Sequence, residues 1–277
     1  MRVISYNLRK DRASGELVAL AAKYEPDLLC LQEADTLELP DDIGTLHLAD
    51  STLTNRLGLA VYYRQDRFEA VTTRAFALKK SLHDMVLRPA HERLIGTRLI
   101  DKEAQRELVV ASFHAAPLTA RNSLRRNQIR SAHEELNRLG PGLPTLMVGD
   151  YNYPIFKGNL GDKITESGYD LTLSDTRTYT RYKFFSGHFD FATSVGLTIE
   201  NVETLPRGTS DHMPILVTSS YTADPVKETV RQSARKAVRV TDAARTDAAR
   251  TDAAAATAAT SAAGTLPEKP LGTDFDI

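Results

Sequence analysis

Cysteine is almost absent from the chain, and its scarcity excludes two kinds of structure. Cys30 is the single cysteine among 277 residues. No disulfide can therefore form within the chain, and a structural metal site rich in cysteine is excluded. The chain also lacks an excess of charge of either sign. The net charge is −1 at pH 7, so no overall positive field attracts the protein to nucleic acid.

Long apolar runs are also missing. No run approaches the roughly 20 residues that a helix needs to span a bilayer. Residues 1–7 lack the apolar segment of a secretory signal. We therefore expect a soluble cytoplasmic protein without a membrane span, and we expect a monomer. Apolar residues still make up 42% of the chain, which is enough for a globular core.

The composition changes near residue 220. Residues 1–219 are mixed in character, whereas 220–277 contain few large apolar side chains and a short Thr-Asp-Ala-Ala-Arg repeat. Such a segment cannot bury a core of its own. We predict one globular domain over 1–219 and a polar, helical or disordered tail over 220–277. The tail is interpreted as a solvated segment without a site, and a tether or partner-binding arm is the alternative.

The chain is organised around the stretch at 144–155. An apolar run at 143–148 predicts a buried strand that ends at Gly149. Asp150 and Asn152 follow at positions i and i+2, so on an extended backbone their side chains point to the same side. A carboxylate beside an amide suits the holding of a phosphate oxygen or a polarised water. The alternative is an ordinary turn stabilised by the aspartate.

A strand, a helix and a strand are predicted at the start of the chain. The strands cover residues 3–8 and 28–31, and apolar residues at helical spacing cover 17–24. Asn7 lies near the end of the first strand and Glu33 follows the second. If the two strands are parallel, both side chains lie at one edge of the sheet. The alternatives are a turn residue for Asn7 and a solvated strand end for Glu33.

The middle of the chain predicts hairpins and then a helix. Short strands are expected at 58–63, 68–71, 94–99 and 108–114, and the last one ends on His114. A lone histidine at a strand end is more often a structural hydrogen bonder than a catalyst. Residues 119–139 predict a helix that Gly140 to Gly142 end. Its arginines are expected mostly on a solvated face, and they are Arg121, Arg125, Arg126 and Arg130.

Two acids and a histidine stand out near the end of the globular part. Asp190 lies within an aromatic run at 184–192, where a carboxylate needs a partner. Asp211 and His212 precede the last apolar strand. Neighbours on an extended backbone point to opposite sides, so each is expected to have its own partner.

The polar residues at strand ends combine oxygen ligands with histidine. This assortment suits Mg²⁺ and phosphate chemistry and differs from the ligand set of a structural zinc site. The set comprises Asn7, Glu33, His114, Asp150, Asn152, Asp211 and His212.

Six short motifs follow one another along residues 3–217. They are Ser5-Tyr6-Asn7, Pro26 to Glu33, Phe113-His114, Gly149 to Asn152, Phe189 to Phe191, and Ser210 to Pro214. With these motifs in this order, the chain resembles the endonuclease/exonuclease/phosphatase superfamily, which has the DNase-I-like fold. The resemblance implies an α/β fold, a four-layer αββα sandwich of two mixed, mainly antiparallel sheets flanked by helices. It also implies hydrolysis of phosphate esters with a divalent metal ion.

Three positions depart from the family pattern. Arg9 stands where nucleases of the apurinic type often carry an aspartate, which removes one potential ligand of a second metal ion. His188 stands where an arginine is common, and the chain has no tryptophan for a lesion pocket. The hydrolytic centre therefore carries over, whereas the surface that reads the substrate does not.

The resemblance implies a metal ion held chiefly by Glu33. The ion is expected to be Mg²⁺ or Mn²⁺, with Asn7 adjacent and Asp211 assisting. Asp150 is expected to orient or deprotonate the attacking water.

The remaining residues are expected to handle the phosphate. Asn152 holds the phosphate, and His114 offers a second contact or protonates the leaving oxygen. His212 binds a phosphoryl oxygen or acts as an acid, and Asp190 supports it as a carboxylate–histidine pair.

We predict a metal-dependent phosphoesterase that hydrolyses phosphodiester bonds of nucleic acid, as an endonuclease or exonuclease does. One alternative is a phosphatase or phosphodiesterase on lipid head groups or small phosphoesters, of the sphingomyelinase or inositol-phosphatase kind. A second is a member that uses the fold only for binding. Such members typically lose the acids or the last histidine, and this chain keeps both.

Overall fold

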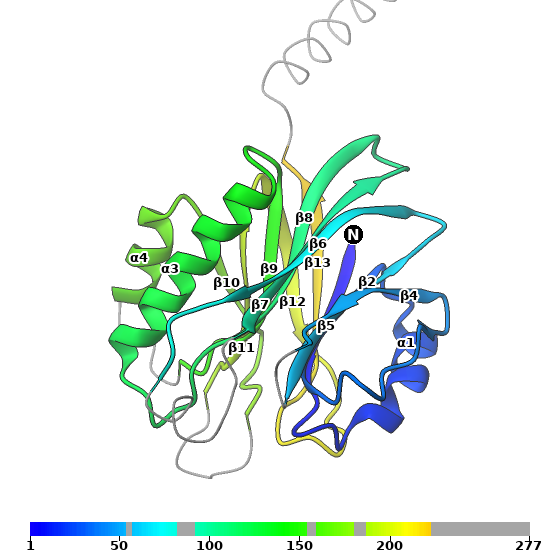
Figure 1. Ribbon diagram of the computed structural model, residues 1–277, viewed down its shortest axis with the longest axis horizontal. Coiled ribbons are helices and arrows are strands. Elements are labelled where there is room, and N and C mark those ends of the chain that lie inside the picture. Colours follow the sequence, from blue (N-terminus) through cyan, green and yellow to red (C-terminus); the bar gives the residue numbers. More distant parts are fainter. Residues whose placement is uncertain (54–56, 82–91, 154–158, 180–186, 223–277) are drawn as a thin grey trace, which may run out of the picture. The chain divides into compact units, whose positions relative to one another are not determined.

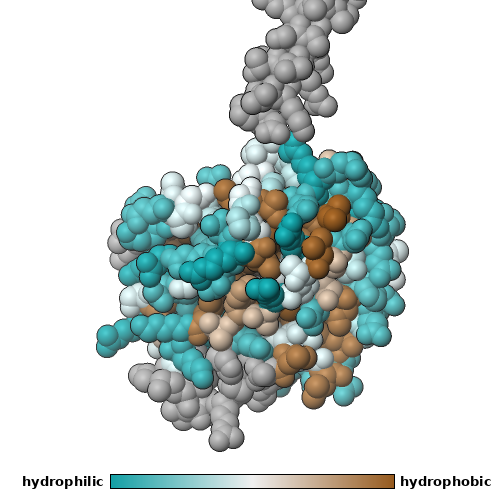
Figure 2. All heavy atoms as spheres, turned by 45° about the horizontal axis from the view of Figure 1, so that its top comes forward, coloured by the Kyte–Doolittle hydropathy of each residue, from teal (hydrophilic) through white to brown (hydrophobic). Residues whose placement is uncertain are grey.

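The computed structural model describes residues 1–53, 57–81, 92–153, 159–179 and 187–222. Residues Met1–Thr222 form one compact unit. Part of the predicted aromatic run at 184–192 and the tail from 223 onward lie outside the described residues. The unit carries large exposed apolar side chains only singly among its described residues, and Figure 2 shows mainly hydrophilic side chains on one face.

The first sheet has seven strands in the order β12-β13-β1-β2-β5-β4-β3. Its inner strand β1 is parallel to β2 and antiparallel to β13, so the first and last strands of the unit are neighbours (Figure 1). The strands are β1 (Arg2–Asn7), β2 (Leu28–Ala34), β3 (Asp42–Ile43), β4 (Leu46–Ser51), β5 (Gly58–Arg64), β12 (Leu197–Thr204) and β13 (Ile215–Tyr221).

The second sheet has six strands in the order β10-β11-β9-β8-β7-β6. Its strand β9 is parallel to β8 and antiparallel to β11. The strands are β6 (Phe68–Ala77), β7 (Glu92–Asp101), β8 (Arg106–His114), β9 (Thr145–Asp150), β10 (Asp170–Leu173) and β11 (Asp190–Val195).

Helices cover the outer face of each sheet. Helix α1 (Leu17–Tyr24), entered through the 3₁₀ turn η1 (Ser14–Glu16), packs on the first sheet. Helices α3 (Asn122–Leu139) and α4 (Asn159–Glu166) pack on the second (Figure 1). A third apolar cluster fills the space between the sheets. These layers confirm the predicted four-layer α/β sandwich.

Parallel pairing brings the functional strand ends together. In the first sheet Asn7 is opposite Gln32, one residue before Glu33, which confirms the predicted parallel pair. In the second sheet His114 is opposite Asp150, and Asp150 is opposite Asp190. The side chains expected at strand ends therefore come from two edges, one in each sheet.

Some elements differ from the sequence predictions. Strands β3, β4 and β10 and helix α4 were not predicted. Helix α3 begins at Asn122 rather than at residue 119. The prediction of a solvated face was wrong for Arg125, which is buried and donates from Nη1 to the carbonyl of Pro117 at 2.7 Å. The apolar stem of Arg125 is buried, and this burial outweighs the preference of its charge for water.

Candidate active site

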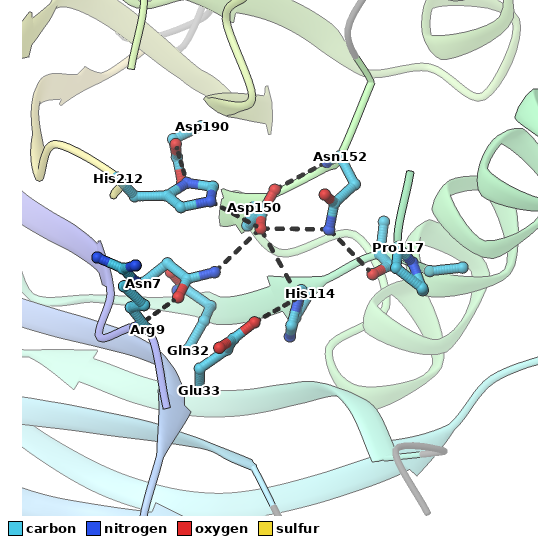
Figure 3. A network of polar contacts seen from close by, with 12 residues as sticks. Asn7, Arg9, Gln32, Glu33, His114, Pro117, Asp150, Asn152, Asp190 and His212 are labelled. Atoms are coloured by element: carbon cyan, nitrogen blue, oxygen red, sulfur yellow. Dashed lines mark hydrogen bonds and ion pairs between the residues drawn. The ribbon is translucent and has the colours of Figure 1, made fainter. Parts of the chain in front are cut away.

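Asp150 is the centre of the polar cluster, and its side chain is almost completely buried. Its Oδ2 atom accepts hydrogen bonds from Asn7 Nδ2 at 3.0 Å and from Asn152 Nδ2 at 3.2 Å. The Nε2 atoms of His114 and His212 lie 3.7 and 3.6 Å from the same oxygen (Figure 3). One carboxylate thus gathers groups from both sheets.

Burial raises the pKa of Asp150 to about 7, an effect that the positive charge of His212 opposes. A carboxylate with such a pKa accepts a proton more readily near neutral pH than a solvated one does. Its position at the centre of the cluster makes it suited to general-base chemistry.

His212 and Asp190 form a buried pair. The Nδ1 atom of His212 lies 2.8 Å from Asp190 Oδ2, and both side chains are at most 7% exposed. The rings of Tyr179 and Phe189 flank the imidazole. Burial alone would lower the pKa of His212, but the carboxylates of Asp190 and Asp150 raise it to about 10. The imidazole is therefore a cation at neutral pH.

Asn152 reaches the cluster by a route that differs from the predicted one. Its φ angle of 47° is left-handed, so the expected extended backbone from Asp150 to Asn152 was wrong. Asp150 Oδ1 accepts from the Asn152 backbone N–H at 2.8 Å, the contact of an aspartate-stabilised turn. The turn folds the amide back, so Asn152 Nδ2 still meets Asp150 Oδ2. The structure therefore contains both the polar pair of Asp150 with Asn152 and the aspartate-stabilised turn that was its alternative.

Glu33 and Asn7 form the part of the cluster that belongs to the first sheet. Glu33 Oε2 accepts from the Lys10 backbone N–H at 2.9 Å, and its Oε1 lies 3.8 Å from His114 Nε2. Asn7 Oδ1 accepts from the Arg9 backbone N–H at 2.9 Å. His114 therefore lies between Glu33 and Asp150, where the two sheets face each other (Figure 3).

Asp211 has a partner separate from that of His212, as predicted for neighbouring residues. Its Oδ2 atom lies 3.6 Å from Arg9 Nε, and the Asp211 side chain is 8% exposed. The residue thus lies beside the cluster and next to a positive charge.

The donor atoms fit a divalent cation. Carboxylate and amide oxygens from Glu33 and Asn7 are hard ligands of the kind that Mg²⁺ and Mn²⁺ prefer. A second group consists of Asp150, Asp190 and His212, whose ligand atoms all lie within 4.8 Å of one another. Both groups contain carboxylate oxygens, which are the ligands that such a cation prefers.

A buried polar network beneath the cluster was not predicted as functional. Gln32 Nε2 donates to Ser5 Oγ at 3.1 Å within the first sheet and to Ser112 Oγ at 2.9 Å in the second sheet. Gln32 belongs to a motif quoted from the sequence, but no local pattern indicates that its side chain crosses between the sheets. The network fixes the distance between the two halves of the cluster.

Two further supports come from residues that were not predicted to have a functional role. Buried Arg93 donates from Nη1 to the carbonyls of His114 at 3.0 Å and Ala115 at 2.9 Å. Ser210 Oγ donates to the Asn7 carbonyl at 2.7 Å and accepts from the His212 N–H at 3.1 Å. Ser210 thereby ties the segment of His212 to the end of β1.

No helix among the described residues has the length and apolar character to cross a membrane. A curated relative, Protein angel of Drosophila melanogaster, is 27% identical over 160 residues, which are 54% of this chain and 44% of that protein. The chain thus spans less than half the length of this relative.

Several solved structures share the fold. The catalytic domain of human Nocturnin with bound sulfate has a TM-score of 0.61 and 18% identity, covering 80% of this chain and 94% of that one. ANGEL2, a 2′,3′-cyclic phosphatase in complex with adenosine-2′,3′-vanadate, has a TM-score of 0.65 and 14% identity over 80% and 96%. TDP2 of D. rerio with a single-strand DNA product has 0.63 and 14% over 79% and 98%.

The family model described as "Endonuclease/Exonuclease/phosphatase family" matches residues 4–212, from β1 to His212. The match includes the strand ends that form the cluster around Asp150. The chain therefore belongs to the endonuclease/exonuclease/phosphatase family of phosphoester hydrolases.

Proposed function

We propose that the chain is a divalent-metal-dependent phosphodiesterase that acts on nucleic acid. The observation that carries the proposal is the convergence on Asp150 of two amides and two histidines. The cluster therefore brings together a general base, hydrogen-bond donors and an imidazolium. The solved structures of ANGEL2 with adenosine-2′,3′-vanadate and of TDP2 with a single-strand DNA product share the fold and support a nucleic-acid substrate.

Asp150 acts as the general base in this proposal. The Nδ2 groups of Asn7 and Asn152 hold its carboxylate in place, and its raised pKa suits removal of a proton from the attacking water. His212, held by Asp190, supplies positive charge to a phosphoryl oxygen as negative charge develops there.

The leaving side of the reaction is assigned to His114. Its Nε2 atom lies between Glu33 and Asp150 and can donate to the leaving oxygen or to the phosphate. Asn152 is assigned a second contact with the phosphate.

Glu33 and Asn7 would hold the metal ion, either Mg²⁺ or Mn²⁺. When bound, a divalent ion neutralises the charge that builds on the phosphoryl oxygens, which is worth several kcal/mol. Glu33 Oε2 is fixed by the Lys10 backbone N–H, so its Oε1 faces the cluster. In this assignment His212 is not a metal ligand, so its imidazole can stay protonated.

The test is hydrolysis of bis-p-nitrophenyl phosphate with Mg²⁺ or Mn²⁺. We expect the activity to fall by about a hundredfold or more in Glu33→Gln, since a charged ligand is removed. Glu69→Gln is the matched control, because Glu69 is an exposed carboxylate on β6 of the other sheet. Full activity in Glu33→Gln, or in excess EDTA, would contradict the proposal.

A second candidate function is phosphomonoester hydrolysis on a small molecule. A mannosyl-6-phosphatase from Bacteroides thetaiotaomicron shares the fold, with a TM-score of 0.62 and 17% identity over 80% of this chain. A panel of single-stranded DNA, RNA, a 2′,3′-cyclic nucleotide, mannose 6-phosphate, phosphoinositide and sphingomyelin separates these substrates. Preference for the sugar phosphate would replace the nucleic-acid assignment, and preference for a lipid would favour the lipid head groups.

A further inference from the structure

The turn after β1 has an unusual backbone. Arg9, Lys10 and Asp11 have φ angles of 50°, 55° and 63°, so three consecutive residues other than glycine are left-handed. Each such residue costs stability, and such conformations persist where surrounding contacts fix them. Strained backbone of this kind is concentrated at functional sites.

The contacts that fix the turn come from the candidate active site itself. Asn7 Oδ1 accepts from the Arg9 N–H, and Glu33 Oε2 accepts from the Lys10 N–H, both at 2.9 Å. The Glu33 carbonyl accepts from the Asp11 N–H, also at 2.9 Å. The two residues assigned to the metal ion thereby also hold the turn, so its shape is tied to the geometry of the site.

The turn presents the Arg9 side chain at the edge of the cluster. Arg9 is 30% exposed, and its Nε lies 3.6 Å from Asp211 Oδ2. In Figure 3 its terminal nitrogens lie on the His212 side of Asn7, away from Glu33. A guanidinium keeps its charge at all accessible pH values and matches the geometry of phosphate oxygens.

We propose that Arg9 binds a non-bridging phosphate oxygen of the substrate and that Asp211 orients its guanidinium. This inference rests on the proposed phosphoesterase function. A divalent ion on Asp211 would be repelled by the positive charge of Arg9 at this distance, so the metal ion stays on the Glu33 side. Arg9 thus supplies a permanent positive charge on the side of the site away from Glu33. This charge favours substrates that carry a phosphate group.

The oxygen can belong to the reacting phosphate or to the next phosphate along a strand. The chemistry of recognition is the same, and two substrates separate the sources. Bis-p-nitrophenyl phosphate has only the reacting group, whereas a thymidine trinucleotide adds a flanking phosphate. A KM that rises for both substrates in Arg9→Gln assigns the reacting phosphate, and a rise for the trinucleotide alone assigns the flanking one.

The first experiment measures sulfate binding by calorimetry in EDTA, which needs neither metal nor turnover. Wild type should bind sulfate, and Arg9→Gln should bind it about tenfold to a hundredfold more weakly, because one charged donor is lost. Arg9→Lys should recover part of the affinity. Arg12→Gln is the matched control, since Arg12 is an exposed arginine three residues along the same segment.

The second experiment counts bound Mn²⁺ by electron paramagnetic resonance. Asp211→Asn should bind as many Mn²⁺ ions per chain as wild type does, whereas Glu33→Gln should bind fewer. Absence of sulfate binding by wild type, equal sulfate binding by Arg9→Gln and wild type, or loss of an Mn²⁺ ion in Asp211→Asn would overturn the inference. Sulfate binding through Arg9 without hydrolysis of any phosphoester would instead overturn only the proposed function.

Discussion

In the proposed mechanism, Asp190 acts through another side chain. Its carboxylate contacts His212 Nδ1, while the opposite ring nitrogen faces Asp150. Asp190 is therefore a positioning residue that fixes the ring and keeps its charge. Because the His212 imidazole and the Asp190 carboxylate are both buried and in direct contact, we expect them to act as one unit rather than as two independent groups.

We predict that Asp190→Asn lowers the pKa of His212 from its raised value of about 10, because the nearest negative charge is removed. Turnover should fall strongly, and adding His212→Ala should change it little more, since residues that act as a unit are non-additive. Histidine NMR titration and single-turnover kinetics measure the two effects. An unchanged pKa with additive losses would remove Asp190 from the site.

At the scale of elements, His133 joins a helix to the sheet beneath it. The residue is on α3, and its ring nitrogens lie 2.8 Å from Ser167 Oγ and 2.9 Å from Thr193 Oγ1. Its ring stacks on Tyr169 with a centroid distance of 3.7 Å. Burial lowers the pKa of His133 to about 3. The ring is therefore neutral in the folded protein and links α3, the end of α4 and β11.

We predict that His133 makes the domain less stable in acid. The unfolded chain takes up a proton near pH 6.5, whereas the folded chain does not until about pH 3, so stability is present above pH 6.5 and is lost as the pH falls below it. The loss between pH 7 and pH 5 should be about 2 kcal/mol. Urea unfolding at the two pH values measures it. His133→Gln should remove most of this difference, while His47→Gln should keep it; equal pH dependence in all three proteins would contradict the prediction.

The elements that the sequence predicts well are those with a strong local pattern. Helix α1 has the predicted bounds, 17–24, and the apolar run before Gly149 is β9. Strand β4 was missed because its residues are mostly half-exposed and its pattern is interrupted by a bulge near Asp50. Local pattern carries little information for strands of this kind.

The site residues were predictable for the same reason, whereas their contacts were not. A polar residue after an apolar run is visible in the sequence, as Asp150 is. The contacts of Asp150 with Asn7 and of Arg9 with Asp211 join residues far apart in the chain. The first depends on how the two sheets face each other, and the second depends on the pairing of β1 with β13. The left-handed backbone of Asn152 also depends on its neighbours rather than on its own preference.

At the scale of the whole molecule, the contacts of β13 indicate where the catalytic domain ends. This strand continues through Tyr221, whose hydroxyl donates to Asp101 Oδ2 at 3.1 Å, and Thr222 Oγ1 donates to the Gly196 carbonyl at 3.0 Å. A cut after residue 219 or 220, as the composition suggested, would remove these contacts. We therefore propose a catalytic domain over residues 1–222.

We predict that removal of residues 223–277 leaves the melting temperature and the phosphodiesterase activity of the domain nearly unchanged. The removed segment has few large apolar side chains, so it contributes little burial to a core. Thermal unfolding and bis-p-nitrophenyl phosphate hydrolysis compare the two proteins. A chain ending at residue 219 is the matched control and should melt at a lower temperature, because it lacks Tyr221. Loss of cooperative unfolding in the 1–222 chain would contradict the prediction.

The pairing of β1 with both β2 and β13 has a consequence for synthesis on the ribosome. Asn7 is made long before residues 215–221, and its strand has an unpaired edge until those residues have emerged. His212 comes only three residues before that last strand. The growing polypeptide therefore lacks the complete cluster around Asp150 until His212 and β13 have emerged from the ribosome.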